Sequence, residues 1–176
     1  MNDDCIAAIL SRGSVRSFTK DSVPEKDVER ILEAGFSAPS AGNRQPWRVV
    51  VVRNESTRMR LARAAFDQKF IAGAPVVLVI CAVPNESAER YRERGRSFYV
   101  FQDTAALTEN ILLAAHIMGY GACWIGAFDE DLVRGVVSVP DDMRPVAIIP
   151  IGKPVRPAAE RRSRRALSEV VILEGF

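Results

Sequence analysis

The sequence predicts an α+β or α/β protein in which helices cover the buried strands of one mixed sheet. Continuous apolar runs at 47–53, 76–83 and 146–152 are typical of buried strands. Segments with apolar residues at helical spacing alternate with these runs. The chain has 176 residues, of which 48% are hydrophobic. It is therefore long enough for one sizeable core, and we expect a single domain over residues 1–176.

The helices are predicted from apolar spacing and from residues that begin or end helices. An acidic first turn precedes apolar residues at helical spacing in 3–11. Ser22 and Glu25 predict a capping box for a second helix, which we expect to end near Ser37. Residues 98–118 show the longest helical pattern, which predicts a central helix stopped by Gly119 and Gly121. Two further helices are predicted, one over 55–66 and one from Asp129.

The strands and the remaining connections follow from local composition. Four consecutive valines in 47–53 favour a strand covered on both faces, and 76–83 is a second such run. Two shorter strands are predicted over 123–126 and 146–152. Residues 38–46 are turn formers and polar residues, so they predict a shaped loop. Residues 85–97 are polar and are compatible with either a loop or an exposed helix.

Charge and apolar run lengths exclude several classes of partner. The formal net charge is only +2, so neither nucleic acid nor an anionic membrane is an expected partner of the chain as a whole. The longest apolar stretch, 74–84, is about half the length of a membrane-spanning helix. Because the first residues are acidic rather than basic, we expect no signal peptide and a cytoplasmic protein.

Cysteine and histidine usage argues against metal chemistry. Cys5, Cys81 and Cys123 lie far apart in the sequence, so we interpret them as small buried hydrophobic residues rather than as disulfide partners or metal ligands. The one histidine, His116, lies in an apolar helical run. Neither a histidine-based zinc site nor a Ser/His/Asp triad is expected.

Three polar clusters could carry chemistry, and each also has a simpler explanation. Residues 12–18 hold two arginines and a serine that could bind a phosphate, or the arginines could cap the end of a helix. Residues 39–45 offer polar groups that suit a heterocycle, or they form a plain connection. The tail after Pro157 is arginine-rich, which is compatible with a solvated surface or a nucleic-acid arm. The chain lacks both the P-loop motif and the third glycine of a dinucleotide fingerprint.

The order of four motifs adds a resemblance that no single cluster carries. They are Arg-x-Ser-x-Arg-x-Phe, then Ala-Pro-Ser-Ala-Gly-Asn-Arg-Gln-Pro-Trp, then Gly-Ala-Cys-Trp-Ile-Gly-Ala-Phe-Asp, then Arg-Pro-Val-Ala-Ile-Ile-Pro-Ile-Gly-Lys-Pro. In this order the sequence resembles the nitroreductase family of FMN enzymes over nearly the whole chain. The segment that resembles the family least is 85–97. The resemblance implies a nitroreductase-like fold, with a long central helix and an intertwined homodimer.

The resemblance also implies which residues hold the cofactor. Arg12, Ser14 and Arg16 correspond to residues that grip the FMN phosphate and the pyrimidine side of the ring, whereas Gly13 replaces a residue that is often basic. Ile125 and Gly126 match a turn whose backbone N–H faces flavin N5. The other implied contacts are Gln68 at the ring, Pro39, Ser40 and Asn43 reaching the flavin of the other subunit, and Arg162 and Arg164, with Arg165 as an alternative, as a second phosphate clamp.

The implied activity is electron transfer from NADH or NADPH through FMN to a small organic acceptor, such as a nitroaromatic or a quinone, by a ping-pong mechanism. No catalytic side chain is expected, because the chemistry takes place on the flavin. Residues 85–98 are expected to border the acceptor pocket, and the tail from about 157 to 176 is expected to pack on the partner subunit. Alternatives on the same fold are reductive dehalogenation, oxidative destruction of the flavin, and a non-catalytic flavin-binding or sensor dimer.

Overall fold

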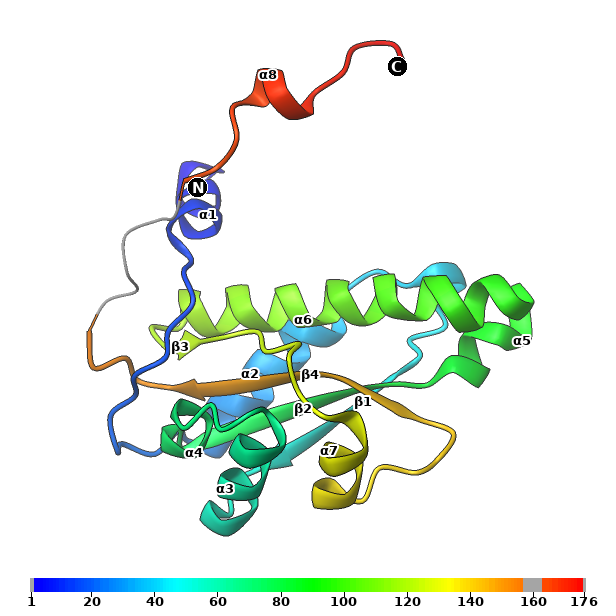
Figure 1. Ribbon diagram of the computed structural model, residues 1–176. Coiled ribbons are helices and arrows are strands. Elements are labelled where there is room, and N and C mark those ends of the chain that lie inside the picture. Colours follow the sequence, from blue (N-terminus) through cyan, green and yellow to red (C-terminus); the bar gives the residue numbers. More distant parts are fainter. Residues whose placement is uncertain (1, 157–162, 176) are drawn as a thin grey trace.

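A computed structural model describes residues 2–156 and 163–175 and contains one four-stranded sheet (Figure 1). The strands are β1 (Trp47–Val52), β2 (Val76–Ala82), β3 (Gly121–Ala122) and β4 (Arg144–Gly152). Their order across the sheet is β1-β2-β4-β3, and each neighbouring pair is antiparallel. The predicted mixed sheet is therefore wrong for these strands. The helices between β1 and β2 bring the chain back at the end where β1 finishes, so that Val52 pairs with Val77.

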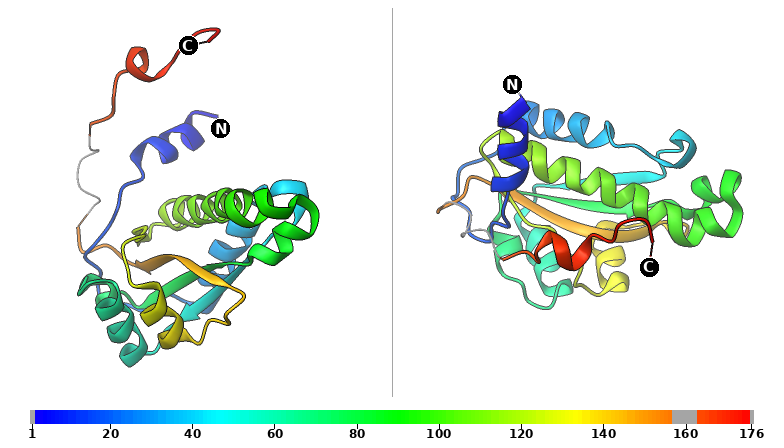
Figure 2. Two further views of the ribbon diagram at one scale, coloured as in Figure 1. Left: turned by 45° about the vertical axis from the view of Figure 1, so that its right-hand side comes forward. Right: turned by 90° about the horizontal axis from the view of Figure 1, so that it is seen from above.

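Helices cover both faces of this sheet (Figures 1 and 2). On one face, α2 (Glu25–Phe36) and α6 (Val100–Ile117) pack through Ile31 and Leu107 against the even-numbered residues of β2. On the other face lie α3 (Glu55–Ala64), α4 (Phe70–Gly73) and α7 (Glu130–Val137). Their buried side chains pack against the odd-numbered residues of β2. Since successive side chains of a strand point to opposite faces, β2 is buried throughout, as predicted.

β1 differs from β2 because it lies at the edge of the sheet. Arg48 is exposed, and Val51 is 40% exposed. The prediction that this valine strand is covered on both faces is thus wrong for the described chain. A run of valines reports high strand propensity, whereas its position within the sheet depends on which strands pair with it.

The predicted central helix is confirmed as α6, which Gly119 ends with a positive φ of 79°. The polar segment before it is helical, because α5 (Pro84–Arg94) and a π-helical turn, η2 (Gly95–Tyr99), lead into α6. Helix α2 approaches α6 closely at Gly35, where a Cβ atom would lie 2.6 Å from Cγ1 of Ile111. Only glycine allows this approach without displacing the Ile111 side chain.

Three local predictions are corrected. Helix α2 begins at Glu25 after an extended Pro24 and has no side-chain cap, so Ser22 does not form the predicted capping box. The predicted strand at 123–126 is replaced by β3 two residues earlier, and Ile125 makes only an isolated bridge to Ile148. Cys5 is exposed rather than buried, whereas the other two cysteines are buried as predicted. The first predicted helix is confirmed as α1 (Asn2–Ser11).

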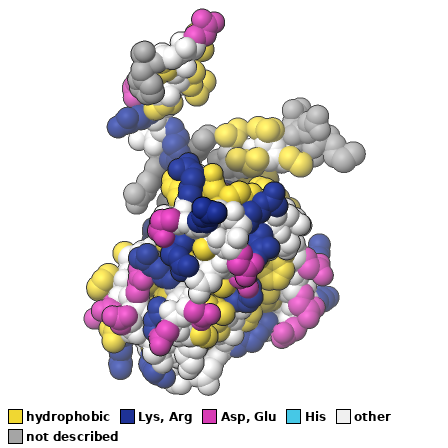
Figure 3. Space-filling model, turned by 90° about the vertical axis from the view of Figure 1, so that its right-hand side faces the viewer, with side chains coloured by type: hydrophobic (Ala, Val, Ile, Leu, Met, Phe, Trp, Pro, Cys, Tyr) yellow, Lys and Arg dark blue, Asp and Glu magenta, His cyan; other side chains and the backbone are white. Residues whose placement is uncertain are grey.

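The two terminal segments expose apolar side chains. On α1, Ile6, Ile9 and Leu10 are each about half exposed. The described part of the tail contains the short helix α8 (Leu167–Val170), projects away from the sheet (Figures 1 and 2) and leaves Leu173 83% exposed. Figure 3 shows hydrophobic side chains on both projecting segments. Within residues 2–156 and 163–175, no helix has the length and apolar character needed to cross a membrane.

Candidate functional site

The structure places the first polar cluster against β3. Ser14 and Ala122 form a parallel bridge, and the backbone N–H of Val15 donates to the carbonyl of Ala122 over 2.9 Å. A Cβ atom on Gly121 would lie only 2.6 Å from Val15, so β3 and residues 12–16 are in tight contact. Two motifs that are more than 100 residues apart in the sequence are therefore side by side.

Side chains of this segment influence the buried thiol of Cys123. Burial raises the pKa of Cys123, and the Arg16 guanidinium, the Ser14 hydroxyl and the Arg12 guanidinium each oppose that rise. Arg12 also forms an ion pair with Glu109 of α6, with 3.3 Å between Nε and Oε1. The guanidinium of Arg16 lies 5.9 Å from the centre of the Phe70 ring. Two cations and a hydroxyl thus converge beside β3, with Gly13 between them in the same segment.

The predicted ring contacts lie along the chain that leaves β3. Ile125 is buried and exchanges two backbone hydrogen bonds of 3.0 Å with Ile148. Gly126 is exposed, and a Cβ atom there would meet nothing within 4 Å. Gln68 donates to the carbonyls of Ala65 (2.9 Å) and Ala127 (3.1 Å), which ties it to this segment. We name these residues the β3 cluster, comprising Arg12, Gly13, Ser14, Arg16, Gln68, Ile125 and Gly126.

The second polar motif lies at the opposite end of α6 from the β3 cluster (Figure 1). Within it, residues 41–43 form the short 3₁₀ helix η1 (Ala41–Asn43). Pro39 and Asn43 are exposed, and the half-buried Ser40 accepts a hydrogen bond from the Gln45 N–H over 3.0 Å. Within one chain, the structure therefore does not bring Pro39, Ser40 and Asn43 to the β3 cluster. We refer to residues 39–45 as the polar loop.

The predicted second phosphate clamp lies partly outside the described residues. Arg162 lies outside the described residues. Arg164 is in the exposed tail, where its Nη1 donates to the carbonyl of Ser163 over 3.3 Å. The alternative, Arg165, is also exposed. Their assignment remains a prediction from the resemblance.

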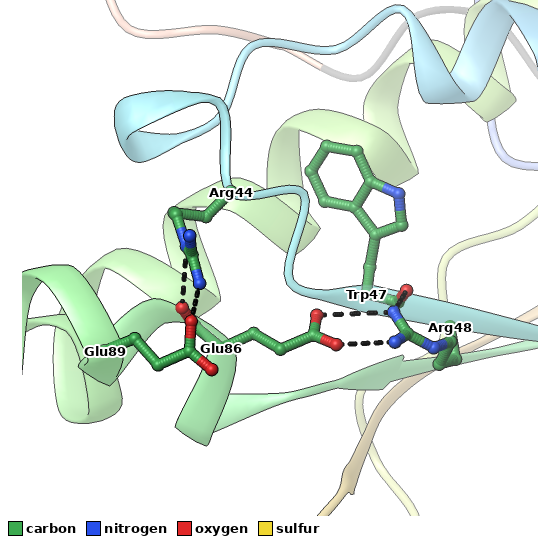
Figure 4. A network of polar contacts seen from close by, with 5 residues as sticks. All are labelled: Arg44, Trp47, Arg48, Glu86 and Glu89. Atoms are coloured by element: carbon green, nitrogen blue, oxygen red, sulfur yellow. Dashed lines mark hydrogen bonds and ion pairs between the residues drawn. The ribbon is translucent and has the colours of Figure 1, made fainter.

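Ionic contacts that the sequence reading missed hold the polar loop to α5 (Figure 4). Arg44 pairs with Glu89, and its Nε donates to the backbone carbonyl of Glu86 over 3.0 Å. The carboxylate of Glu86 accepts from Arg48 of β1, with a shortest distance of 2.5 Å. The i, i+3 spacing of the two glutamates, which puts them on one helix face, was the available sequence signal.

Asp103 is a second contact that was missed, and it holds the polar loop to α6. Its Oδ1 accepts the Ala41 N–H over 2.9 Å, while Oδ2 is buried and has no hydrogen-bond partner among the described residues. Burial raises the pKa of Asp103, and the hydrogen bond from Ala41 opposes the rise. An aspartate inside the predicted central helix over 98–118, close to its start, was the signal that could have identified it.

A cavity beside Gly126 adjoins a second cavity that shares part of its lining. One, of about 360 Å³, is lined by Gly126, Phe101, Phe128, Glu130, Arg144, Pro145 and Val146. The other, of about 530 Å³, shares Phe101, Glu130 and Arg144 with the first and reaches Asn85, Arg96 and Ser97. The polar segment before α6 therefore borders a hollow that continues toward Gly126. A bidentate ion pair between Arg144 and Glu130, with hydrogen bonds of 2.6 and 2.8 Å, lies where the two cavities meet.

Fold and site together define a three-layer α+β protein with a basic cluster at one edge of its sheet and a cavity beside an exposed glycine. The model of the nitroreductase family matches residues 9–69 and 63–153. The chain belongs to the nitroreductase family, which confirms the resemblance seen in its motifs. It is an oxidoreductase.

Individual relatives match over most of their length. An Archaeoglobus fulgidus protein provisionally named as an NADH dehydrogenase/NAD(P)H nitroreductase is 32% identical over 156 residues, covering 86% of each chain. The NADH dehydrogenase of Thermus thermophilus is 33% identical, covering 86% of this chain and 87% of its own. The fold is shared with the NADPH:FMN oxidoreductase of Vibrio harveyi, solved with NAD+, at 24% identity and a TM-score of 0.89 over 98% of this chain and 78% of that one.

Proposed function

We propose that this protein is an FMN-dependent oxidoreductase that works as a homodimer and passes electrons from NADH or NADPH to a small organic acceptor. The observation that carries the proposal is the contact of residues 12–16 with β3, which places Arg12, Ser14 and Arg16 beside the strand from which the chain runs on to the exposed Gly126. The names of the similar proteins, which mention NAD(P)H and in one case FMN, support the same reading.

The donors of the β3 cluster suit the phosphate of FMN. A guanidinium carries five N–H donors, and the ion pair of Arg12 with Glu109 is formed through Nε, so the remaining donors can address an anion. The Ser14 hydroxyl and Arg16 belong to the segment that lies against β3, and both lower the pKa of the Cys123 thiol. Charge-assisted hydrogen bonds of this kind are the stronger class in proteins, so these residues would hold a dianionic phosphate firmly.

The neighbouring segment suits the ring of the cofactor. No contact within the chain requires glycine at position 126, because an added Cβ would enter open space. A planar ligand that approaches the backbone N–H closely would require it. Bound there, FMN would accept hydride from NAD(P)H and return the electrons to an acceptor. Arg16 would place a positive charge where negative charge develops on reduction, and Gln68 would keep the 126–127 backbone in position.

A homodimer would complete the site. Because the polar loop and the β3 cluster lie at opposite ends of α6, a second copy that packs its own α6 in the reverse direction would present its loop to this cluster. In such a dimer, Ser40 of the partner subunit and Asn43 of the partner subunit supply the polar contacts that the single chain does not. The exposed apolar residues of α1 and of the tail would be covered by the same association.

The acceptor would enter through the cavities beside Gly126. Phe101 and Phe128 offer aromatic surface, and Asn85 and Arg96 line the outer part. This combination suits a small planar molecule with polar substituents, such as a nitroaromatic or a quinone. No protein side chain needs to act as a nucleophile or a general acid, because the electron transfer belongs to the cofactor.

The absorption spectrum of the purified protein tests the proposal. We expect a flavin spectrum, either directly or after addition of FMN, and bleaching by NADH or NADPH without oxygen. Light scattering should give twice the mass of one chain. Arg16→Ala should weaken FMN binding, whereas Arg60→Ala, in a cavity between α3 and α7 that no residue of the β3 cluster lines, should not. A colourless protein that does not take up FMN would refute the proposal.

A further inference from the structure

The polar loop turns tightly, and Gln45 is the one of its three positive-φ residues whose type disfavours that backbone region. Gly42, Asn43 and Gln45 all have positive φ angles, of 57°, 54° and 51°. Only glycine adopts this region freely, and asparagine is the next most tolerant residue. Short-range hydrogen bonds support this shape, such as the Asn43 N–H to the Ser40 carbonyl over 2.9 Å and the Gln45 N–H to the Ser40 hydroxyl over 3.0 Å. External contacts add to these bonds.

Helix α5 supplies most of these external contacts. Arg44 binds both the carboxylate of Glu89 and the backbone carbonyl of Glu86, and the Glu86 side chain in turn holds Arg48 at the start of β1 (Figure 4). The hydroxyl of Tyr91 lies so close to Gly42 that a Cβ atom there would be 2.7 Å from it. The Arg44 side chain thus ties the polar loop to α5, and Gly42 of the loop packs against the surface of α5.

The helix that holds the loop is itself fixed by its neighbours. Gly95 packs on Ser87 so tightly that a Cβ atom would lie 2.4 Å from the Ser87 carbonyl oxygen. The Tyr91 ring meets the Tyr99 ring edge-on, with 5.0 Å between centroids, and Arg94 donates to the Tyr99 hydroxyl over 2.9 Å. These contacts join α5 to η2 across a kink at Arg92, where φ is 51°.

We propose that α5 positions the polar loop for its cofactor contacts, with Arg44 as the positioning residue and Glu86 and Glu89 as its anchors. The inference rests on the proposed function, since it assumes that Ser40 and Asn43 contact FMN bound to the partner subunit. Asn85, at the start of the same helix, lines the cavity that continues toward Gly126. One end of α5 consequently borders the proposed acceptor cavity, and the face that carries Glu86 and Glu89 holds the polar loop in position.

The test compares two arginines with the same kinds of contact. Arg44→Ala removes one carboxylate ion pair and one hydrogen bond to a backbone carbonyl at the loop. Arg53→Ala removes the same pair of contacts, to Glu25 and to the Val23 carbonyl, far from the loop. The readouts are the FMN dissociation constant from flavin fluorescence, the melting temperature, and the mass in solution of each full-length variant.

We expect Arg44→Ala to raise the FMN dissociation constant by about 3- to 10-fold, which is the effect of losing one hydrogen-bonding residue. Arg53→Ala should leave it within about 2-fold while lowering the melting temperature similarly. Adding Glu89→Gln to Arg44→Ala should weaken FMN binding no further, because both changes break one interaction. Arg44→Glu should be rescued in part by Glu89→Arg.

The outcomes separate this inference from the proposed function. If the unaltered protein fails to bind FMN, both are wrong. If it binds FMN and Arg44→Ala has the same dissociation constant, or no larger a change than Arg53→Ala, only the positioning role is overturned. If Arg44→Ala is monomeric, the FMN dissociation constant of Glu89→Gln is the deciding measurement, because this variant keeps Arg44 and its hydrogen bond to Glu86. An unchanged FMN dissociation constant in a dimeric Glu89→Gln variant also overturns the positioning role.

Discussion

Replacing Gly121 by alanine tests the contact on which the β3 cluster depends. The added Cβ atom would lie 2.6 Å from Cβ and Cγ1 of Val15 and 2.8 Å from Cγ2. Val15 is 7% exposed, and its N–H is bonded to Ala122, so neither its side chain nor its backbone can move independently. The methyl group therefore fits only if residues 12–16 move away from β3.

The size of the effect follows from this geometry. Overpacking a well-packed site costs typically about 1–3 kcal/mol. In a chain of this length, about 1 kcal/mol shifts the melting temperature by roughly 2–4 °C, so Gly121→Ala should lower it by roughly 2–12 °C. Gly135→Ala is the matched control, because Gly135 lies in α7 and a Cβ there would meet nothing within 4 Å. Its helix propensity predicts a gain of about 0.5–1 kcal/mol.

Thermal unfolding of both variants without cofactor, followed by FMN titration, checks the reasoning. We expect Gly121→Ala to lose FMN affinity by about 10-fold or more, equivalent to about 1.4 kcal/mol, because the displaced segment carries Arg12, Ser14 and Arg16. Gly135→Ala should bind FMN like the unaltered protein. An undiminished melting temperature would show that Val15 yields to the methyl group. A lowered melting temperature with unchanged FMN affinity would show that residues 12–16 do not hold the cofactor.

Three further outcomes are expected. Arg12→Ala should weaken FMN retention by about 1.5–3 kcal/mol, the cost of losing a charged partner, and unchanged retention in a fluorescence titration would contradict the phosphate assignment. Burial and the 2.6 Å hydrogen bond to Asp27 raise the pKa of Tyr120 to about 12. The contribution of Tyr120 to the free energy of unfolding is therefore complete below the usual pKa near 10 and is lost as the pH rises from 10 to 12. The stability gap between the protein and Tyr120→Phe, about 0.5–1.5 kcal/mol in urea at pH 7, should narrow over that window, and a constant gap would contradict this. A chain ending at Arg165 should dissociate at concentrations where the full chain is dimeric, and an equal mass by sedimentation would show that the tail does not join the subunits.

Local sequence patterns predicted most elements but not how the elements combine. The central helix, the buried β2 run and the helix capped by Asp129 were predicted because apolar spacing and capping act over a few residues. The prediction of a mixed sheet was wrong for the four strands, because strand direction depends on where the connecting helices return the chain, and local patterns do not show this. The burial of β1 was wrong for a similar reason, since an edge position is a property of the whole sheet.

The candidate site divides in the same way. Its residue types were readable from the sequence, since arginines, a serine and a glycine in ordered motifs carried the resemblance to the family. The Arg44–Glu89 pair and the Asp103 bond were not readable, because each joins residues more than 40 positions apart through contacts that exist only in the folded chain.

By itself, the sequence determined the family of this protein and most of its helices and strands, and it predicted which polar residues would meet a flavin. The helices and strands follow from local periodicity, whereas the family and the flavin contacts were inferred from the resemblance of four ordered motifs. Only the tertiary structure decided that the first motif lies against β3, that the polar loop lies at the other end of α6, and that α5 holds this loop. Such distances depend on packing between segments remote in the chain, and the separation they produce within one subunit is the physical reason to expect a second.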